Sequence, residues 1–153
     1  MKKLTFLLAS LCLTLLINAA ENSGNQRKTY NFNSDWKLHI GDITDASQVA
    51  FDDKGWKSVT LPHAFNEDEA FKLHIEQLTD TVVWYRKHFR LPETDKGKKV
   101  FIEFEGVRMA AEVYVNGIKI GLHENGVMGF GFDITSSIHY AGDNLIAVRV
   151  DNS

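Results

Sequence analysis

The sequence predicts an all-β fold, an antiparallel β-sandwich, and two observations in residues 100–151 carry this prediction. Apolar and polar side chains alternate in four runs, and turn signals separate the runs. A period of two places the apolar residues on one side of each strand, whereas parallel sheets contain continuously hydrophobic strands. Asn116-Gly117 interrupts the second run, and this dipeptide favours the positive φ angles of a type I′ hairpin turn.

Each run predicts a strand that is buried on one face only. The second run returns after its turn as the other half of a hairpin. The apolar positions, in chain order, are Val100, Ile102 and Phe104; Ala111, Val113 and Val115, returning as Ile118 and Ile120; Phe130, Phe132 and Ile134; and Ile146, Val148 and Val150.

The first half of the chain predicts three further strands. They are residues 30–40, residues 56–61 before Pro62, and residues 84–90 before Leu91-Pro92. Residues 42–55 are predicted to form a loop with room for one helical turn, and residues 95–99 a charged turn. Residues 63–81 lack strand alternation and predict a short helix or a long loop. A connection of this length in a compact β-domain is usually functional or poorly ordered.

Length and the N-terminal segment define the predicted domain organisation. Residues 1–20 combine a basic start, an apolar stretch and a small-residue site at Ala20, which predicts a secretory signal peptide. The protein is therefore expected to be secreted or periplasmic. The apolar stretch is too short to span a membrane. Leu11 before Cys12 is too large for the usual lipidation signal. Residues 21–29 are predicted to be flexible, and residues 30–153 to form the single sandwich domain.

Composition argues against several classes of function. Loss of Lys2 and Lys3 with the signal peptide leaves 15 basic against 20 acidic residues, so the mature chain carries a formal charge of −5. The sequence contains no basic cluster, so binding to nucleic acid or to an anionic membrane is not predicted. The mature chain has no cysteine, so neither a disulfide nor a thiol nucleophile is expected. The six histidines form no H-x-x-x-H or H-x-H pair, and no metal or other cofactor is predicted.

Nine short motifs follow one another over about 120 residues. They are residues 32–37 (FNSDWK), 55–59 (GWKSV), 61–63 (LPH), 84–89 (WYRKHF), 104–107 (FEGV), 113–117 (VYVNG), 121–123 (GLH), 132–135 (FDIT) and 144–150 (NLIAVRV). Their order resembles the N-terminal sugar-binding domain of glycoside hydrolase family 2, which contains β-galactosidases, β-glucuronidases and β-mannosidases.

The resemblance implies a galactose-binding-like jelly roll whose last strands would follow Ser153. It also implies a catalytic (β/α)8 barrel elsewhere in the complete enzyme, where the family carries its catalytic glutamates. In the family, the loop between the LPH and WYR motifs reaches the active site. The implied substrate-binding residues are His63, Asn66, Glu67 and Asp68, and no catalytic residue is assigned to this chain.

The loop candidates also have purely structural explanations. His63 can stabilise the loop after Pro62 without touching a sugar. Glu67 and Asp68 can belong to an exposed acidic loop or to the first turn of a helix, where acidic residues are favoured. The sequence leaves these alternatives open.

For other residues the structural explanation is the predicted one. Glu103 and Glu105 are expected on a solvated strand face rather than as the carboxylate pair of a retaining glycosidase. His123 is expected to bond a loop carbonyl. Three tryptophans are expected to pack in the core rather than stack on sugar rings: Trp36, Trp56 and Trp84.

Two interpretations of function remain. The chain is either the N-terminal domain or a fragment of a secreted retaining glycosidase, with a β-galactosidase as the expected parent, or a free-standing carbohydrate-binding module. The expected partners are a β-galactoside or related β-glycoside and the missing barrel. An exposed sheet edge also predicts a homodimer through that edge. Alone, the chain is not expected to hydrolyse glycosides.

Overall fold

The computed structural model describes residues 27–67 and 81–153. The predicted signal peptide, residues 21–26 of the predicted flexible segment and most of the connection between residues 63 and 81 lie outside the described residues. Residues 27–32 belong to a first unit and have no regular secondary structure there. Residues 33–153 form the second unit, which contains all the strands described below. Among the described residues, no helix is long and apolar enough to cross a membrane.

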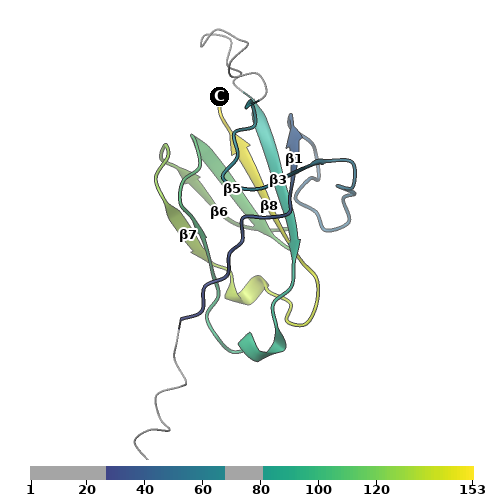
Figure 1. The fold of residues 1–153 in the computed structure, drawn as a ribbon, viewed down its shortest axis with the longest axis vertical. Helices are drawn as coiled ribbons and strands as arrows, with labels where there is room; N and C mark the ends of the chain where they lie inside the picture. The colour runs from purple at the N-terminus through teal and green to yellow at the C-terminus, as the bar shows by residue number, and fades with distance from the viewer. Residues whose placement is uncertain (1–26, 68–80) are drawn as a thin grey trace, which may run out of the picture. The chain divides into compact units, whose positions relative to one another are not determined.

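The described part of the second unit forms two antiparallel sheets (Figure 1), which confirms the predicted fold class. Six strands pair in the order β2-β1-β3-β8-β5-β6, and β4 pairs with β7 in a smaller sheet. The strands are β1 (Trp36–Ile40), β2 (Lys57–Val59), β3 (Val82–Phe89), β4 (Phe101–Phe104), β5 (Ala110–Val115), β6 (Ile118–Glu124), β7 (Phe130–Asp133) and β8 (Asn144–Asp151).

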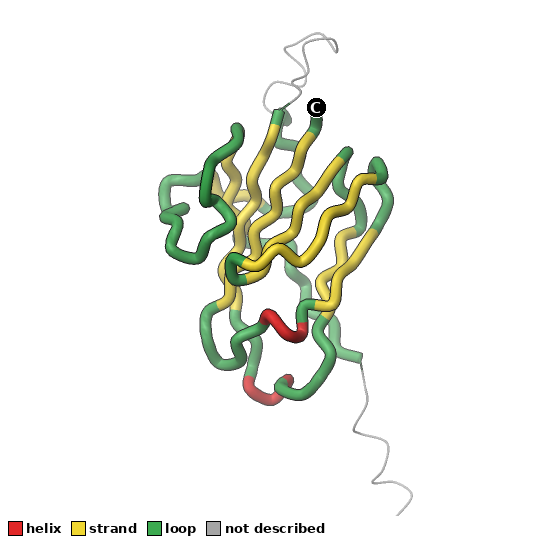
Figure 2. The backbone as a smooth tube through the Cα atoms, turned by 180° about the vertical axis from the view of Figure 1, so that it is seen from behind, coloured by secondary structure: helices red, strands yellow, loops and turns green. Residues whose placement is uncertain are grey.

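Two short 3-10 helices lie at the end of the sandwich opposite the C-terminus (Figure 2). They are η2 (Glu93–Asp95) and η3 (Thr135–Ser137). A bridge between Leu91 and Tyr140 ties the two connecting segments together. The opposite end of the sandwich, where β8 ends, is therefore free of helices among the described residues.

The two sheets pack through an aromatic layer between β6 and β7. The Phe132 ring lies so close to Gly121 that a Cβ atom at this position would overlap it, which explains the glycine in the middle of β6. Beside it, His123 stacks on Phe130 with 4.1 Å between ring centroids. The residues buried between the sheets and around their ends include Trp36, Leu38, Val83, Ile102, Val113, Val115, Ile134, Ile146 and Val148.

The prediction that each strand is buried on one face is wrong for β8. Leu145 and Ala147 on its second face are also buried, at 1% and 0% exposure. The reason is the loop between β1 and β2, which folds over this face and packs Ala46 against Trp84 and Ala147. A central strand with both faces covered cannot be recognised from alternation alone.

Several strand boundaries differ from the sequence prediction, and two of the differences have a visible cause in the backbone. β1 begins at Trp36 rather than at residue 30, because Asp35 has a φ of +59°, which an extended strand cannot include. β2 begins at Lys57 rather than at Trp56, whose amide donates to the Asp53 carbonyl (3.0 Å) in a turn.

The turn and core predictions are largely confirmed. Asn116 and Gly117 have φ angles of +51° and +82°, as a type I′ turn requires. Trp36 and Trp84 are buried, at 2% and 4% exposure. Trp56 is half-buried and packs against the rings of His39 and Phe51. β2 and β6 are the edge strands of the larger sheet, so the edge-to-edge dimer, which stays a prediction, would use one of them.

Candidate functional site

The loop after β2 carries the residues predicted to contact sugar. The Leu61 amide donates to the Asn33 carbonyl (2.8 Å), which anchors the start of the loop. The Glu67 amide donates to the Ala64 carbonyl (3.1 Å), so residues 64–67 form a turn. This turn places Glu67 next to the side chain four residues earlier, His63.

His63 is buried between two polar partners. Its side chain is 5% exposed, and Nδ1 lies 3.3 Å from the Tyr85 hydroxyl oxygen. On the other side, Nε2 lies 3.4 Å from Oε1 of Glu67 without the alignment of a hydrogen bond. Nε2 is therefore a buried polar atom that has no hydrogen-bond partner among the described residues. Such atoms are rare in folded proteins, which draws attention to the Glu67 contact.

Glu67 is the exposed member of this group. Its side chain is 54% exposed, and Lys57 Nζ on β2 lies 3.9 Å from the same Oε1 atom. Both contacts with the described residues involve Oε1, which leaves Oε2 available to accept a hydrogen bond from a ligand. Of the other predicted residues, Asn66 is half-buried in the turn, and Asp68 lies outside the described residues.

Tyr85 belongs to this group, although no feature of the sequence predicts a role for it. Strand pairing places it opposite Leu38 on β1 and Val148 on β8, both of which are buried. Burial, with a smaller contribution from the negative charge of Glu67, raises the Tyr85 pKa to about 12. The hydroxyl is therefore protonated at neutral pH and able to donate. Only the register between β1, β3 and β8 brings it to His63, and no local sequence signal reports that register.

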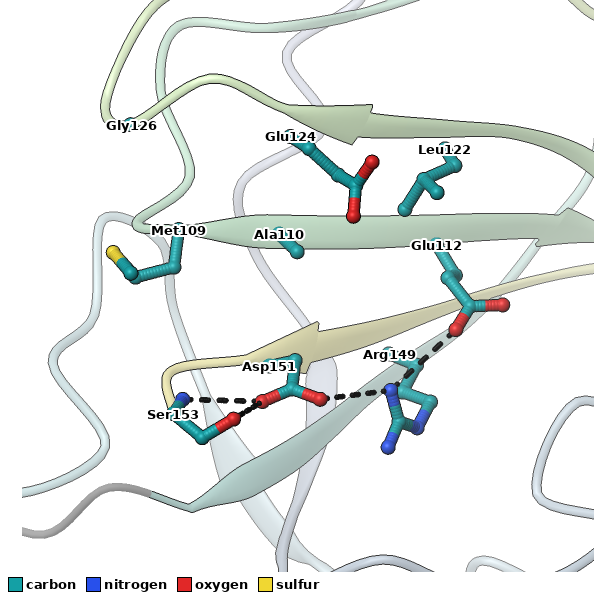
Figure 3. Close-up of a pocket in the computed structure, with 9 residues that line it drawn as sticks. All are labelled: Met109, Ala110, Glu112, Leu122, Glu124, Gly126, Arg149, Asp151 and Ser153. Atoms are coloured by element: carbon teal, nitrogen blue, oxygen red, sulfur yellow. Dashed lines mark hydrogen bonds and ion pairs between the residues drawn. The ribbon is translucent and has the colours of Figure 1, made fainter.

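A second candidate region is a hollow of about 430 Å³ on the outer face of β5, β6 and β8 (Figure 3). Strand register places Ala110 between Glu124 and Asp151, and in the next row Glu112 between Leu122 and Arg149. Because the Ala110 side chain is small, it leaves space at the base of the hollow. The complete lining is Met109, Ala110, Glu112, Leu122, Glu124, Gly126, Arg149, Asp151 and Ser153.

Arg149 in this hollow forms hydrogen bonds with three carboxylates of the protein. Nε and Nη2 donate to the carboxylate of Asp42, the shortest contact being 2.7 Å. Nη1 donates to Glu112 (3.4 Å) and Asp151 (3.3 Å). The hydrogen bond from Arg149 is the main cause that holds the Asp42 pKa below its usual range. The guanidinium therefore holds the loop between β1 and β2 against the sheet. A ligand that binds Arg149 would have to displace these hydrogen bonds.

Glu112 is held in the same way. It accepts from Lys119 Nζ (2.6 Å) and from the Tyr114 hydroxyl (2.7 Å). Both hydrogen bonds lower the Glu112 pKa, and the hydrogen bond from Lys119 has the larger effect. Burial and the hydrogen bond to Glu112 raise the Tyr114 pKa to about 12. The polar side chains of the hollow therefore largely satisfy one another, and the three predicted substrate-binding residues that the structure describes, His63, Asn66 and Glu67, do not line it.

The carboxylate pair and most of the possible metal ligands considered from the sequence lie among the described residues. Glu103 and Glu105 are both exposed, as expected for a solvated strand face. Within residues 27–67 and 81–153, no three His, Cys, Asp or Glu side chains are placed to hold a metal ion. The expectation that His123 bonds a loop carbonyl is not met among the described residues, where its Nε2 is buried without a hydrogen-bond partner and the ring stacks on Phe130.

Comparison with known proteins shows which family this chain resembles. Residues 56–153 match the family model described as a glycosyl hydrolase 2 galactose-binding domain-like domain. A β-glucuronidase of Formosa agariphila is 42% identical over 137 residues, covering 85% of this chain and 14% of that enzyme. A β-galactosidase of Thermoanaerobacter pseudethanolicus is 46% identical over 129 residues, covering 82% of this chain and 17% of that enzyme.

Solved structures agree with these matches. The crystal structure of a Bacteroides uniformis β-glucuronidase superposes with a TM-score of 0.79 at 34% identity, over 84% of this chain and 15% of that protein. The chain thus spans between 14% and 17% of the length of these relatives. Since the family model covers more than half of the chain and the fold agrees, the chain belongs to the galactose-binding-like domain family of glycosyl hydrolase 2 enzymes.

Proposed function

We propose that this chain is the N-terminal sugar-binding domain of a retaining β-glycosidase and that the loop after β2 contributes to the substrate site of the complete enzyme. The observation that carries the proposal is Glu67. It is an exposed carboxylate beside the almost fully buried His63, in the loop that the family resemblance assigns to the active site. A carboxylate held in this way accepts hydrogen bonds from sugar hydroxyls. The catalytic barrel is the proposed partner that supplies the two hydrolytic carboxyl groups.

A β-galactoside is the proposed substrate class. Glu67 is the first of three consecutive acidic residues in the sequence, Glu67-Asp68-Glu69. A neutral hexoside offers hydroxyl donors to such residues, whereas the carboxylate of a β-glucuronide would be repelled. The nearby cation Lys57 already contacts Glu67, so it is not free to neutralise a uronate. These charges favour the neutral sugar.

Exchanging domains between enzymes tests both parts of this proposal. The aligned segment of the T. pseudethanolicus β-galactosidase, and separately that of the F. agariphila β-glucuronidase, is replaced by residues 30–153 of this chain. We expect the first chimaera to hydrolyse an aryl β-galactoside. The second should lose most of its activity on an aryl β-glucuronide, because the Glu67 carboxylate would repel the uronate. The isolated chain is the control and should give no turnover.

Two outcomes would contradict the proposal. Inactivity of both chimaeras, when both are folded, would remove the assignment as a domain of the catalytic unit and favour the free-standing module. Full β-glucuronidase activity with a dead β-galactosidase chimaera would keep the domain assignment and overturn the substrate class.

A further inference from the structure

The Tyr85, His63 and Glu67 side chains form one chain of contacts that runs from the core to the surface. Tyr85 lies on the central strand β3, His63 is 5% exposed, and Glu67 is 54% exposed. The contact distances are 3.3 Å between the Tyr85 oxygen and His63 Nδ1, and 3.4 Å between His63 Nε2 and Glu67 Oε1. The rings of Tyr85 and His63 meet edge to face, at 72° between their planes. The histidine therefore has a hydrogen-bond partner at Nδ1 and, at Nε2, a carboxylate that is close but not aligned for a hydrogen bond.

These partners select one tautomer of the neutral imidazole. A neutral histidine carries one N–H and one lone pair on its two ring nitrogens. The group beside Nε2 is a carboxylate, which only accepts, so Nε2 should carry the hydrogen. Nδ1 is then the acceptor, and the Tyr85 hydroxyl can donate to it. The opposite tautomer would point the Nε2 lone pair at a carboxylate oxygen and leave a buried acceptor unpaired, which is costly.

We propose that Tyr85 is a positioning residue that fixes His63 as the Nε2–H tautomer, and that His63 thereby holds Oε1 of Glu67 so that Oε2 is presented to the ligand. The role in sugar recognition rests on the proposed function of the loop, whereas the tautomer and its control by Tyr85 do not. Lys57 contacts Oε1 from the strand β2, so the same oxygen is held from two sides. A carboxylate with one fixed oxygen loses less conformational entropy when the other oxygen accepts a hydroxyl.

Tyr85→Phe is the test, because it removes the donor and keeps the ring. Long-range ¹H–¹⁵N NMR spectra of the whole chain report which nitrogen of each histidine is protonated, and His63→Gln assigns the His63 signals. In the wild type we expect the Nε2–H pattern at His63. In Tyr85→Phe we expect a mixture of the two tautomers, together with a shift of the Glu67 side-chain ¹³C resonances towards those of a freely rotating glutamate.

Tyr140→Phe is the matched control, because the Tyr140 hydroxyl is also buried but has no hydrogen-bond partner among the described residues. It should leave the His63 pattern unchanged. An Nδ1–H tautomer in the wild type would overturn the proposal, as would a Tyr85→Phe spectrum in which His63 and Glu67 change no more than in Tyr140→Phe. Should Tyr85→Phe unfold the chain, the wild-type tautomer alone still decides. A correct tautomer combined with no effect of Glu67 on glycosidase activity would retain the positioning role and reject the role in sugar recognition.

Discussion

Replacing Arg86 with alanine is expected to lower the free energy of unfolding by about 3–5 kcal/mol, the cost of removing one partner from a buried ion pair. Arg86 is fully buried on β3, and its Nε donates to Asp53 (2.8 Å). Its two terminal nitrogens donate to the carbonyl oxygens of Ala46, Gln48 and Phe51. One side chain thus organises the loop that covers the second face of β3 and β8. Without it, the three carbonyls lose the donor, and Asp53 keeps only His88 Nε2, at 3.2 Å.

The pH dependence of this variant should also differ from that of the wild type. Burial of Asp53 opposes its ionisation, but the hydrogen bonds and charges of Arg86 and, to a smaller extent, His88 outweigh burial, so the Asp53 pKa is lowered. This contribution to stability is present above the unfolded pKa of aspartate and is lost as the pH falls through the lowered value. In Arg86→Ala, burial remains and only His88 is left to oppose it, so the loss of stability at low pH should be smaller than in the wild type.

Urea unfolding followed by circular dichroism measures the effect. Arg90→Ala is the matched control, because Arg90 pairs with Asp143 at the surface, where the two side chains are 70% and 72% exposed. The urea concentration at which Arg90→Ala is half unfolded should equal that of the wild type. Asp53→Asn keeps the three carbonyl contacts of Arg86 and should cost less than Arg86→Ala, which keeps the comparison informative if Arg86→Ala does not fold. Equal stability of Arg86→Ala and Arg90→Ala would refute the organising role.

Replacing Asn144 with alanine is the second large effect that we expect, about 2–4 kcal/mol, because a buried group left without a partner costs roughly 1–3 kcal/mol. Asn144 is 1% exposed at the start of β8. Its Oδ1 accepts from the His139 amide (2.8 Å) and from Asn116 Nδ2 (2.9 Å), and its Nδ2 donates to the His139 carbonyl (2.8 Å). The side chain thereby closes the loop before β8 onto the hairpin turn.

Asn125→Ala tests whether the position rather than the residue type matters. Asn125 is exposed in the loop between β6 and β7, and the one side-chain contact described for it is with the Met128 sulfur, at 3.6 Å. Thermal melts of the two variants should separate clearly, with Asn125→Ala close to the wild type. Similar melting of both would show that water replaces the Asn144 contacts at little cost.

The strands could be predicted because their signal is local. Alternation located the starts of β3 to β8 within two residues, and Asn116-Gly117 specified its turn correctly. Asn116 also shows where local reasoning ends: its side-chain oxygen accepts from the Leu145 amide (2.8 Å), a contact that depends on β5 pairing with β8. The turn residue is thus also a tertiary anchor.

The candidate site was predicted less completely, because some of its contacts depend on strand register and not on local sequence. Proximity within the LPH loop identified His63 and Glu67, and the structure brings the two together. Tyr85 could not be found, because it is 22 residues from His63 and reaches it only through strand register. The role of Arg86 was equally hidden, since its partners are backbone carbonyls in a loop without a motif.

The most direct test of the central claim, that the loop after β2 contributes to a glycosidase site, is Glu67→Gln in the β-galactosidase chimaera. A hydrogen bond to a charged acceptor contributes about 1.5–3 kcal/mol, so we expect kcat/KM for an aryl β-galactoside to fall by about 10- to 100-fold. Glu93→Gln, an exposed glutamate in η2, is the control and should have no effect. If Glu67→Gln retains the kcat/KM of the Glu93→Gln chimaera, the loop does not touch the substrate and the account is contradicted.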